Sequence, residues 1–154
     1  MVAGLSEKYE DMPVCICQVA NWEFYYKEGE KQLHLYQSGV DFDADIVVCK
    51  FIENCKVDDF DAEVFEKQYK LMVDSMTKNA STVVYLGGFW AHPGNAIIEK
   101  IAAERGCKYI PIDDLGSRDD MKAFDTFGDL PPSGHPGDKG MEEIANRILN
   151  AINN

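Results

Sequence analysis

The chain has 154 residues, of which 45% are hydrophobic, 11% aromatic and 27% charged, a mix typical of a globular domain with a sizeable core. It carries 15 Lys and Arg residues against 27 Asp and Glu residues, which gives a formal net charge of −12. This charge argues against binding to nucleic-acid phosphates or to an anionic membrane, because both partners need a cationic surface. A small neutral or cationic molecule, or a sugar, is compatible with it.

The predicted elements alternate between strands and helices, and they indicate one α/β domain over residues 1–154 with a mainly parallel sheet. Short apolar runs predict strands, apolar residues at helical spacing predict helices, and mixed polar stretches predict loops. In chain order these are a buried strand at 13–20, a mixed segment at 23–37, a strand at 45–51, a helix at 61–78, a strand at 81–86, a helix at 95–105, a strand at 108–112, a loop-rich stretch at 113–137 with a short helix at 118–124, and a helix at 138–152.

Targeting segments, metal sites and cofactor sites are not indicated. The longest nearly apolar run, 83–91, is far shorter than the roughly 20 residues that a spanning helix needs. The first ten residues are polar and charged, unlike a signal peptide, so a cytoplasmic location is favoured. The cysteines form no C-x-x-C pair, which argues against zinc, and we expect all of them to be reduced and mostly buried. They are Cys15, Cys17, Cys49, Cys55 and Cys107.

In parallel α/β folds, ligands bind beyond the carboxyl ends of the strands. The residues that follow the predicted strands are therefore the candidates for a site. They are Asn21 and Trp22, Glu53 and Asn54, Phe89, Trp90 and His92, Asp113 and Asp114, and the loop with His135 before the last helix.

The most specific stretch is 133–148, SGHPGDKGMEEIANRI. It places a His-Pro pair before a Gly-rich turn and an amphipathic helix, and a His on such a loop suits a general base. This stretch resembles the last block of the SGNH (GDSL-type) esterases and lipases. The resemblance covers about 13–152, because 45–54, DIVVCKFIEN, is similar to the family's third block, and 14–22 is similar to its second strand. The two later strands match as well.

The resemblance implies a three-layer α/β/α sandwich with a flavodoxin-like sheet, and hydrolysis of acyl or acetyl esters, often on a carbohydrate. In that mechanism His135 is the base, and Asn54 with a backbone amide near Trp22 holds the oxyanion. No cofactor is implied. The substrate would be bound by Asn21, Trp22, Glu53, Phe89 and Trp90.

Two departures from the family pattern leave open whether the chain is an enzyme. The family begins with a strand ending in Gly-Asp-Ser, whose Ser is the nucleophile, and no such block is present. Ser6 is the nearest match, but only seven residues separate it from Val14, whereas a parallel crossover takes about a dozen. The family's Asp lies three residues before the His, where this chain has Pro132, so Asp129 is the available acid.

The sheet would also lack its first strand, and unpaired backbone groups in the middle of a sheet are costly. A chain truncated from a longer gene, a partner chain, or strand exchange in a homo-oligomer would each account for this, and we favour the homo-oligomer.

Alternatives remain open for the function and for single residues. The main one is a non-catalytic relative that keeps the groove as a binding or interaction module. A flavodoxin-like cofactor domain is disfavoured, because no phosphate loop follows the first strand. At the residue level, His135 could pack against the last helix, Asn54 could end a strand as a turn residue, and Trp22, Phe89 and Trp90 could belong to the core rather than to an aromatic platform.

Overall fold

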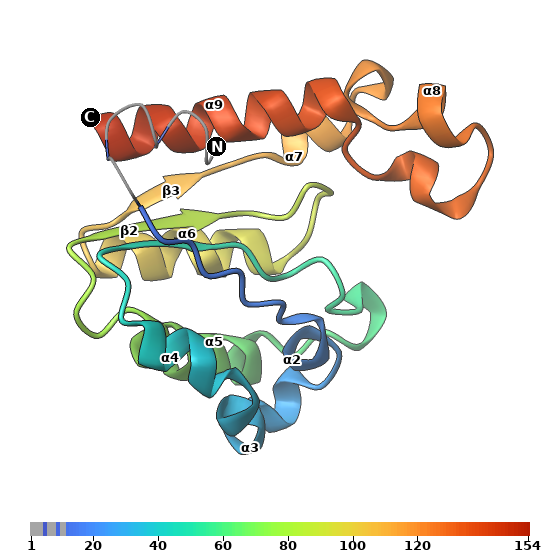
Figure 1. The fold of residues 1–154 in the computed structure, drawn as a ribbon. Coiled ribbons are helices and arrows are strands. Elements are labelled where there is room, and N and C mark those ends of the chain that lie inside the picture. The colour runs from blue at the N-terminus through green and yellow to red at the C-terminus, as the bar shows by residue number, and fades with distance from the viewer. Residues whose placement is uncertain (1–4, 6–8, 10–11) are drawn as a thin grey trace.

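The computed structural model of the protein describes residues 5, 9 and 12–154 (Figure 1). Its sheet has three parallel strands in the order β1 (Ile46–Cys49), β2 (Thr82–Leu86) and β3 (Lys108–Ile110). Val48 is in register with Val84, and Tyr85 with Tyr109. The mixed α/β class and the parallel strands predicted from the sequence are confirmed.

Helices form the rest of the regular structure, and they fall into a long group and a short group. The longer ones are α5 (Ala62–Met76), α6 (Gly94–Glu104) and α9 (Asp138–Asn153), close to the predicted ranges. The short ones are α2 (Ala20–Phe24), α3 (Gly29–Gln32), α4 (Gln37–Phe42), α7 (Asp113–Gly116) and α8 (Phe124–Phe127), with 3-10 turns at Tyr26–Glu28, Leu33–Tyr36, Val57–Asp59, Asp119–Met121 and Pro131–Gly134. No helix within the described residues is long and apolar enough to cross a membrane.

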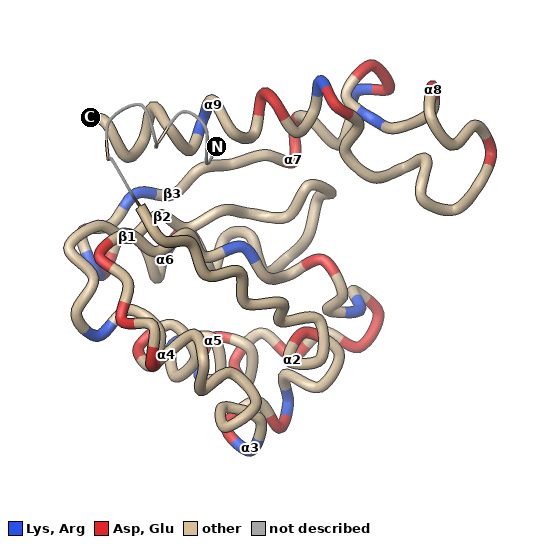
Figure 2. The backbone as a smooth tube through the Cα atoms, in the orientation of Figure 1, with Lys and Arg blue, Asp and Glu red and all other residues tan. Residues whose placement is uncertain are grey.

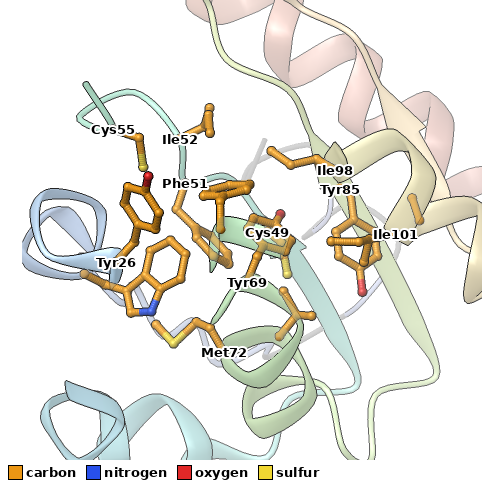
Figure 3. Packing of buried hydrophobic residues seen from close by; sticks show 14 of the residues in the cluster. Tyr26, Cys49, Phe51, Ile52, Cys55, Tyr69, Met72, Tyr85, Ile98 and Ile101 are labelled. Carbon is orange, nitrogen blue, oxygen red and sulfur yellow. The ribbon is translucent and has the colours of Figure 1, made fainter. Parts of the chain in front are cut away.

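Two hydrophobic clusters lie against the sheet because successive strand side chains point to opposite faces. Tyr85 belongs to a cluster with residues of α5 and α6, such as Tyr69 and Ile98 (Figure 3). Its neighbours in β2, Val84 and Leu86, belong to a second cluster with Ile144 and Ile148 of α9. Charged residues of both signs are spread along the surface elements (Figure 2).

Local signals explain where the long helices begin and end. The Asp61 carboxylate accepts the Val64 N–H at 3.0 Å and caps α5, in agreement with the acidic residues predicted at its start. α6 ends before Gly106, whose φ of 63° is readily adopted only by glycine, and the Cys107 N–H then reaches the Ala102 carbonyl at 2.9 Å. Asp138 is the first residue of α9 rather than its cap, which is Gly137.

The prediction of a buried strand at 13–20 is wrong. This segment runs as a coil into α2, and Val14 and Ile16 are 45% and 87% exposed. A strand forms only where its backbone finds a partner, and within the described residues β1 pairs with β2 alone. The mixed segment at 23–37 also differs from expectation, because it folds into consecutive short helices.

Candidate functional site

A groove of about 510 Å³ lies at the carboxyl ends of β1 and β2. One wall comes from the loop after β1, a second from Trp90 and His135, and a third from the segment that leads into α2. The lining residues are Ile16, Cys17, Gln18, Val19, Ala20, Glu23, Lys50, Glu53, Asn54, Trp90 and His135. The polar members include two carboxylates, one ammonium, two amides and one imidazole, a set suited to binding a small polar molecule.

The backbone around His135 is held by the chain that precedes α8. The His135 carbonyl accepts the Ala123 N–H at 2.9 Å, and the Gly137 N–H donates to the Met121 carbonyl at 2.9 Å. Only glycine fits at position 137, because a Cβ there would lie 2.6 Å from the Lys122 carbonyl oxygen. The His135 loop is therefore anchored on both sides of the imidazole.

The His135 ring is exposed and lies edge-on to Trp90, with the ring centroids 5.1 Å apart at 80°. Trp90 is half-buried and also lies edge-on to Phe89. Within the described residues no hydrogen bond occupies the ring nitrogens of His135.

The loop after β1 is held by Glu23, which comes from α2. The Glu23 carboxylate accepts the Glu53 N–H at 3.0 Å and also the Asn54 side-chain amide. Glu23 is only 5% exposed. Burial raises the pKa of this carboxyl, although the hydrogen bond from Asn54 and the positive charge of Lys50 act in the opposite direction.

The second carboxylate of the groove, Glu53, joins the loops that follow β1 and β2. It accepts the Phe89 N–H at 2.7 Å and forms an ion pair with Lys50. The two carboxylates thus have different surroundings, since Glu23 is buried among neutral donors and Glu53 faces an ammonium.

Four of the residues predicted for the site line this groove together: Glu53, Asn54, Trp90 and His135. Within the described residues, no cluster of His, Cys, Asp and Glu is placed to hold a metal ion.

Other predicted site residues lie elsewhere. Trp22 is fully buried in the core, packs edge-on to Phe51 at 5.1 Å and does not line the groove. Phe89 is 1% exposed and belongs to the cluster under α9. Both are aromatic residues at the ends of predicted strands, where sequence alone does not separate core from platform. Asn21 is exposed and does not line the groove.

Asp129, the predicted acid, is exposed after α8 and forms no hydrogen bond or ion pair with His135 within the described residues. A two-proline 3-10 turn, Pro131–Gly134, separates the two. Ser6 lies outside the described residues.

The charged residues Glu23 and Lys50 of the groove were not predicted from the sequence, nor were the lining residues 16–20. A weak signal for Glu23 exists, because it is a carboxylate inside the aromatic stretch NWEFYY. Trp22 and Tyr26 of this stretch are core residues, and an acid buried beside them needs hydrogen-bond donors.

His92, another residue considered for the site, is held by two hydrogen bonds. The Nδ1 atom of His92 accepts the Gly94 N–H at 3.0 Å, so its Nε2–H donates to the Cys55 carbonyl at 2.9 Å. Burial lowers the pKa of His92, in agreement with this neutral form.

All five cysteines are free thiols, but only Cys49 and Cys55 are buried.

Comparisons of the chain with protein-family models, with curated proteins and with solved structures find no match.

Proposed function

We propose that the protein is an ester hydrolase similar to the SGNH family, with helices on both faces of its sheet in a three-layer α/β/α arrangement. One observation supports this most strongly: His135 and Asn54, from distant parts of the chain, line one groove at the carboxyl ends of parallel strands. A base and an amide donor on one groove are what acyl transfer requires. The substrate is a small acyl or acetyl ester, with a sugar as the alcohol, because Trp90 lines the groove with an aromatic ring and Glu53 offers hydrogen-bond acceptors.

In the proposed reaction, His135 takes a proton from a water molecule whose oxygen attacks the ester carbonyl carbon. The Asn54 amide donates to the oxygen that becomes negative. Collapse of this intermediate breaks the bond to the alcohol oxygen, and the imidazolium returns its proton to the alkoxide. Ester and water thus give acid and alcohol. Water is the proposed nucleophile because the described part of the groove has no Ser or Thr hydroxyl, and burial raises the pKa of the lining thiol, Cys17.

Turnover of p-nitrophenyl acetate tests this function. His135→Ala should lower the rate about 100-fold or more, because a general base contributes that much. His34→Ala is the matched control, since His34 is exposed and only its Nδ1 contacts the Lys31 carbonyl. Equal rates in wild type and His135→Ala would contradict the proposal.

A binding module without catalysis is the second candidate. It is favoured by the bond between Asn54 and Glu23, which already uses one amide donor, and by the lack of a lining hydroxyl. Such a module would show no turnover, and its affinity for a panel of acetylated sugars would be lost in Trp90→Ala. Phe24→Ala is the control, because Phe24 is an aromatic side chain, 55% exposed, outside this groove.

We also propose that a second copy of the chain completes the sheet at the outer edge of β1. Within the described residues this edge has no strand partner, and the neighbouring segment exposes Val14 and Ile16. Analytical ultracentrifugation should show a dimer that Ile16→Lys dissociates. Val57→Lys, at a site 57% exposed, should leave the dimer intact. A wild-type chain that stays monomeric up to high concentration would rule this out.

A further inference from the structure

The buried carboxylate of Glu23 has no place in the proposed reaction, yet it bonds to a residue that does. It comes from α2, is 5% exposed, and receives two hydrogen bonds from the loop after β1. We propose that Glu23 is a positioning residue, which fixes the Asn54 amide so that its second N–H points to the groove.

The orientation of Asn54 follows from the chemistry of its partner. An ionised carboxylate only accepts hydrogen bonds, so the NH₂ end of the amide must face Glu23. One N–H is used in this bond, and the other N–H has no partner within the described residues. Asn54 lines the groove, so this second N–H is available to a bound oxygen atom.

Glu23 is well anchored for such a role. Its N–H donates to the Val19 carbonyl at 3.1 Å, and its carbonyl accepts the Cys55 thiol at 3.4 Å. The preceding residue, Trp22, is fully buried in the core. Because both the backbone and the carboxylate are held, Glu23 can restrict the rotation of Asn54 without touching a ligand.

The contact depends on the charge of Glu23. When ionised, the Glu23 carboxylate accepts hydrogen bonds from both the Glu53 N–H and the Asn54 amide. When it is protonated, the added hydrogen takes the place of one of these two donors. The charged or titratable groups near it are Lys50, which favours the ionised form, the Cys55 thiol and Tyr36 hydroxyl, and the Cys17, Glu53 and His135 side chains that line the same groove. Burial raises the pKa of Glu23, so the Asn54 contact should loosen in mild acid rather than only near the usual range of Glu.

This inference deepens the proposed hydrolase site and rests on it only for the kinetic test below. The structural test is nuclear magnetic resonance of the ¹⁵N-labelled protein, with the Asn54 side-chain signals identified by their loss in Asn54→Asp. As the pH falls, these signals should shift with a midpoint above the value of about 4.3 for an ordinary Glu. In Glu23→Gln they should start at a new position and no longer titrate.

Glu28→Gln is the matched control, because Glu28 is exposed and pairs only with Lys31. It should keep the wild-type titration. Glu23→Asp, which is one methylene too short to reach both donors, gives a second variant if Glu23→Gln does not fold. Asn54 signals that are unchanged in folded Glu23→Gln or Glu23→Asp, or a titration that persists in Glu23→Gln, would overturn the inference.

The kinetic test is the pH profile of ester hydrolysis. Glu23→Gln should lower kcat on the order of tenfold with little change in KM, and it should remove the loss of rate in acid that Glu23 adds to the loss expected from the base His135. A purely structural role would instead leave the acidic limb of the profile as it is in wild type, and that result would count against positioning. Absence of wild-type turnover would refute the hydrolase proposal, while the Asn54 signals would still decide the role of Glu23.

Discussion

The segment 12–44 and the body formed by residues 45–154 are held together by different means. In the body, three parallel strands pair through their backbones and long helices cover them. In segment 12–44 there is no strand, and its helices are at most six residues long. Three of its aromatic residues, Trp22, Tyr26 and Tyr36, are nevertheless buried in the core of the body.

Side-chain hydrogen bonds to the backbone hold the short helices of segment 12–44 to one another and to the body. The Tyr36 hydroxyl accepts the Trp22 N–H at 2.9 Å, and the Gln68 Oε1 atom accepts the Glu30 N–H at 2.7 Å. A few buried anchors can therefore fix a segment whose helices are all short. This matters for the site, because the segment carries Glu23 into the groove.

The largest expected effect is at the central anchor, Trp22. Its ring is fully buried and lies against Tyr26, Phe51, Phe65 and Tyr69. Trp22→Ala should lower the free energy of unfolding by about 3–5 kcal/mol, measured by urea denaturation. Phe24→Ala, on the same helix but 55% exposed, should cost below about 1 kcal/mol. Similar losses in the two variants would show that segment 12–44 is not anchored as described.

In the body, an ion pair should give a smaller effect that depends on pH. Arg147 donates two hydrogen bonds to the Asp114 carboxylate, both at 2.7 Å, and this contact lowers the pKa of Asp114. The pair therefore stabilises the fold above the ordinary pKa of Asp, and this contribution is lost as the pH falls through the lowered value.

Since the Asp114 side chain is 55% exposed, Asp114→Asn should cost at most about 1 kcal/mol at pH 7. The difference from wild type should shrink below about pH 4, as followed by urea denaturation at several pH values. A cost that stays constant down to pH 2 would contradict a charge effect.

The smallest effect is expected at Ile16, which is 87% exposed. Ile16→Ser should change the stability of the monomer by less than about 0.5 kcal/mol in a dilute sample. Were residues 13–20 a buried strand of the monomer, the same substitution would cost several kcal/mol, and such a loss would restore the original prediction for this segment.

The parts of the fold that sequence predicts are those that periodicity governs. The stripe of apolar residues in 138–152 and the apolar run in 81–86 mark α9 and β2, because each element buries one face or lies inside the sheet. Residues 13–20 have the same apolar character, but whether such a run becomes a strand depends on a partner elsewhere.

Part of the candidate site could also be predicted from the sequence. Topology brings Asn54 and His135 to one edge of the sheet, and the strand-end rule finds both. Trp22 and Phe89 satisfy the same rule, but their side chains turn into the core. Glu23 was missed because its role depends on a contact with the distant loop at 53–54, which no local pattern records.

The central claim is that Asn54, Trp90 and His135 face one groove that binds an ester. Titration of the labelled protein with acetanilide, an amide analogue of phenyl acetate, tests it by nuclear magnetic resonance. The Asn54 side-chain amide, the Trp90 indole N–H and the His135 ring should shift together and give one dissociation constant. Shifts confined to the separate surface around Phe24, Tyr25 and Lys27, or to one wall of the groove only, would contradict the claim.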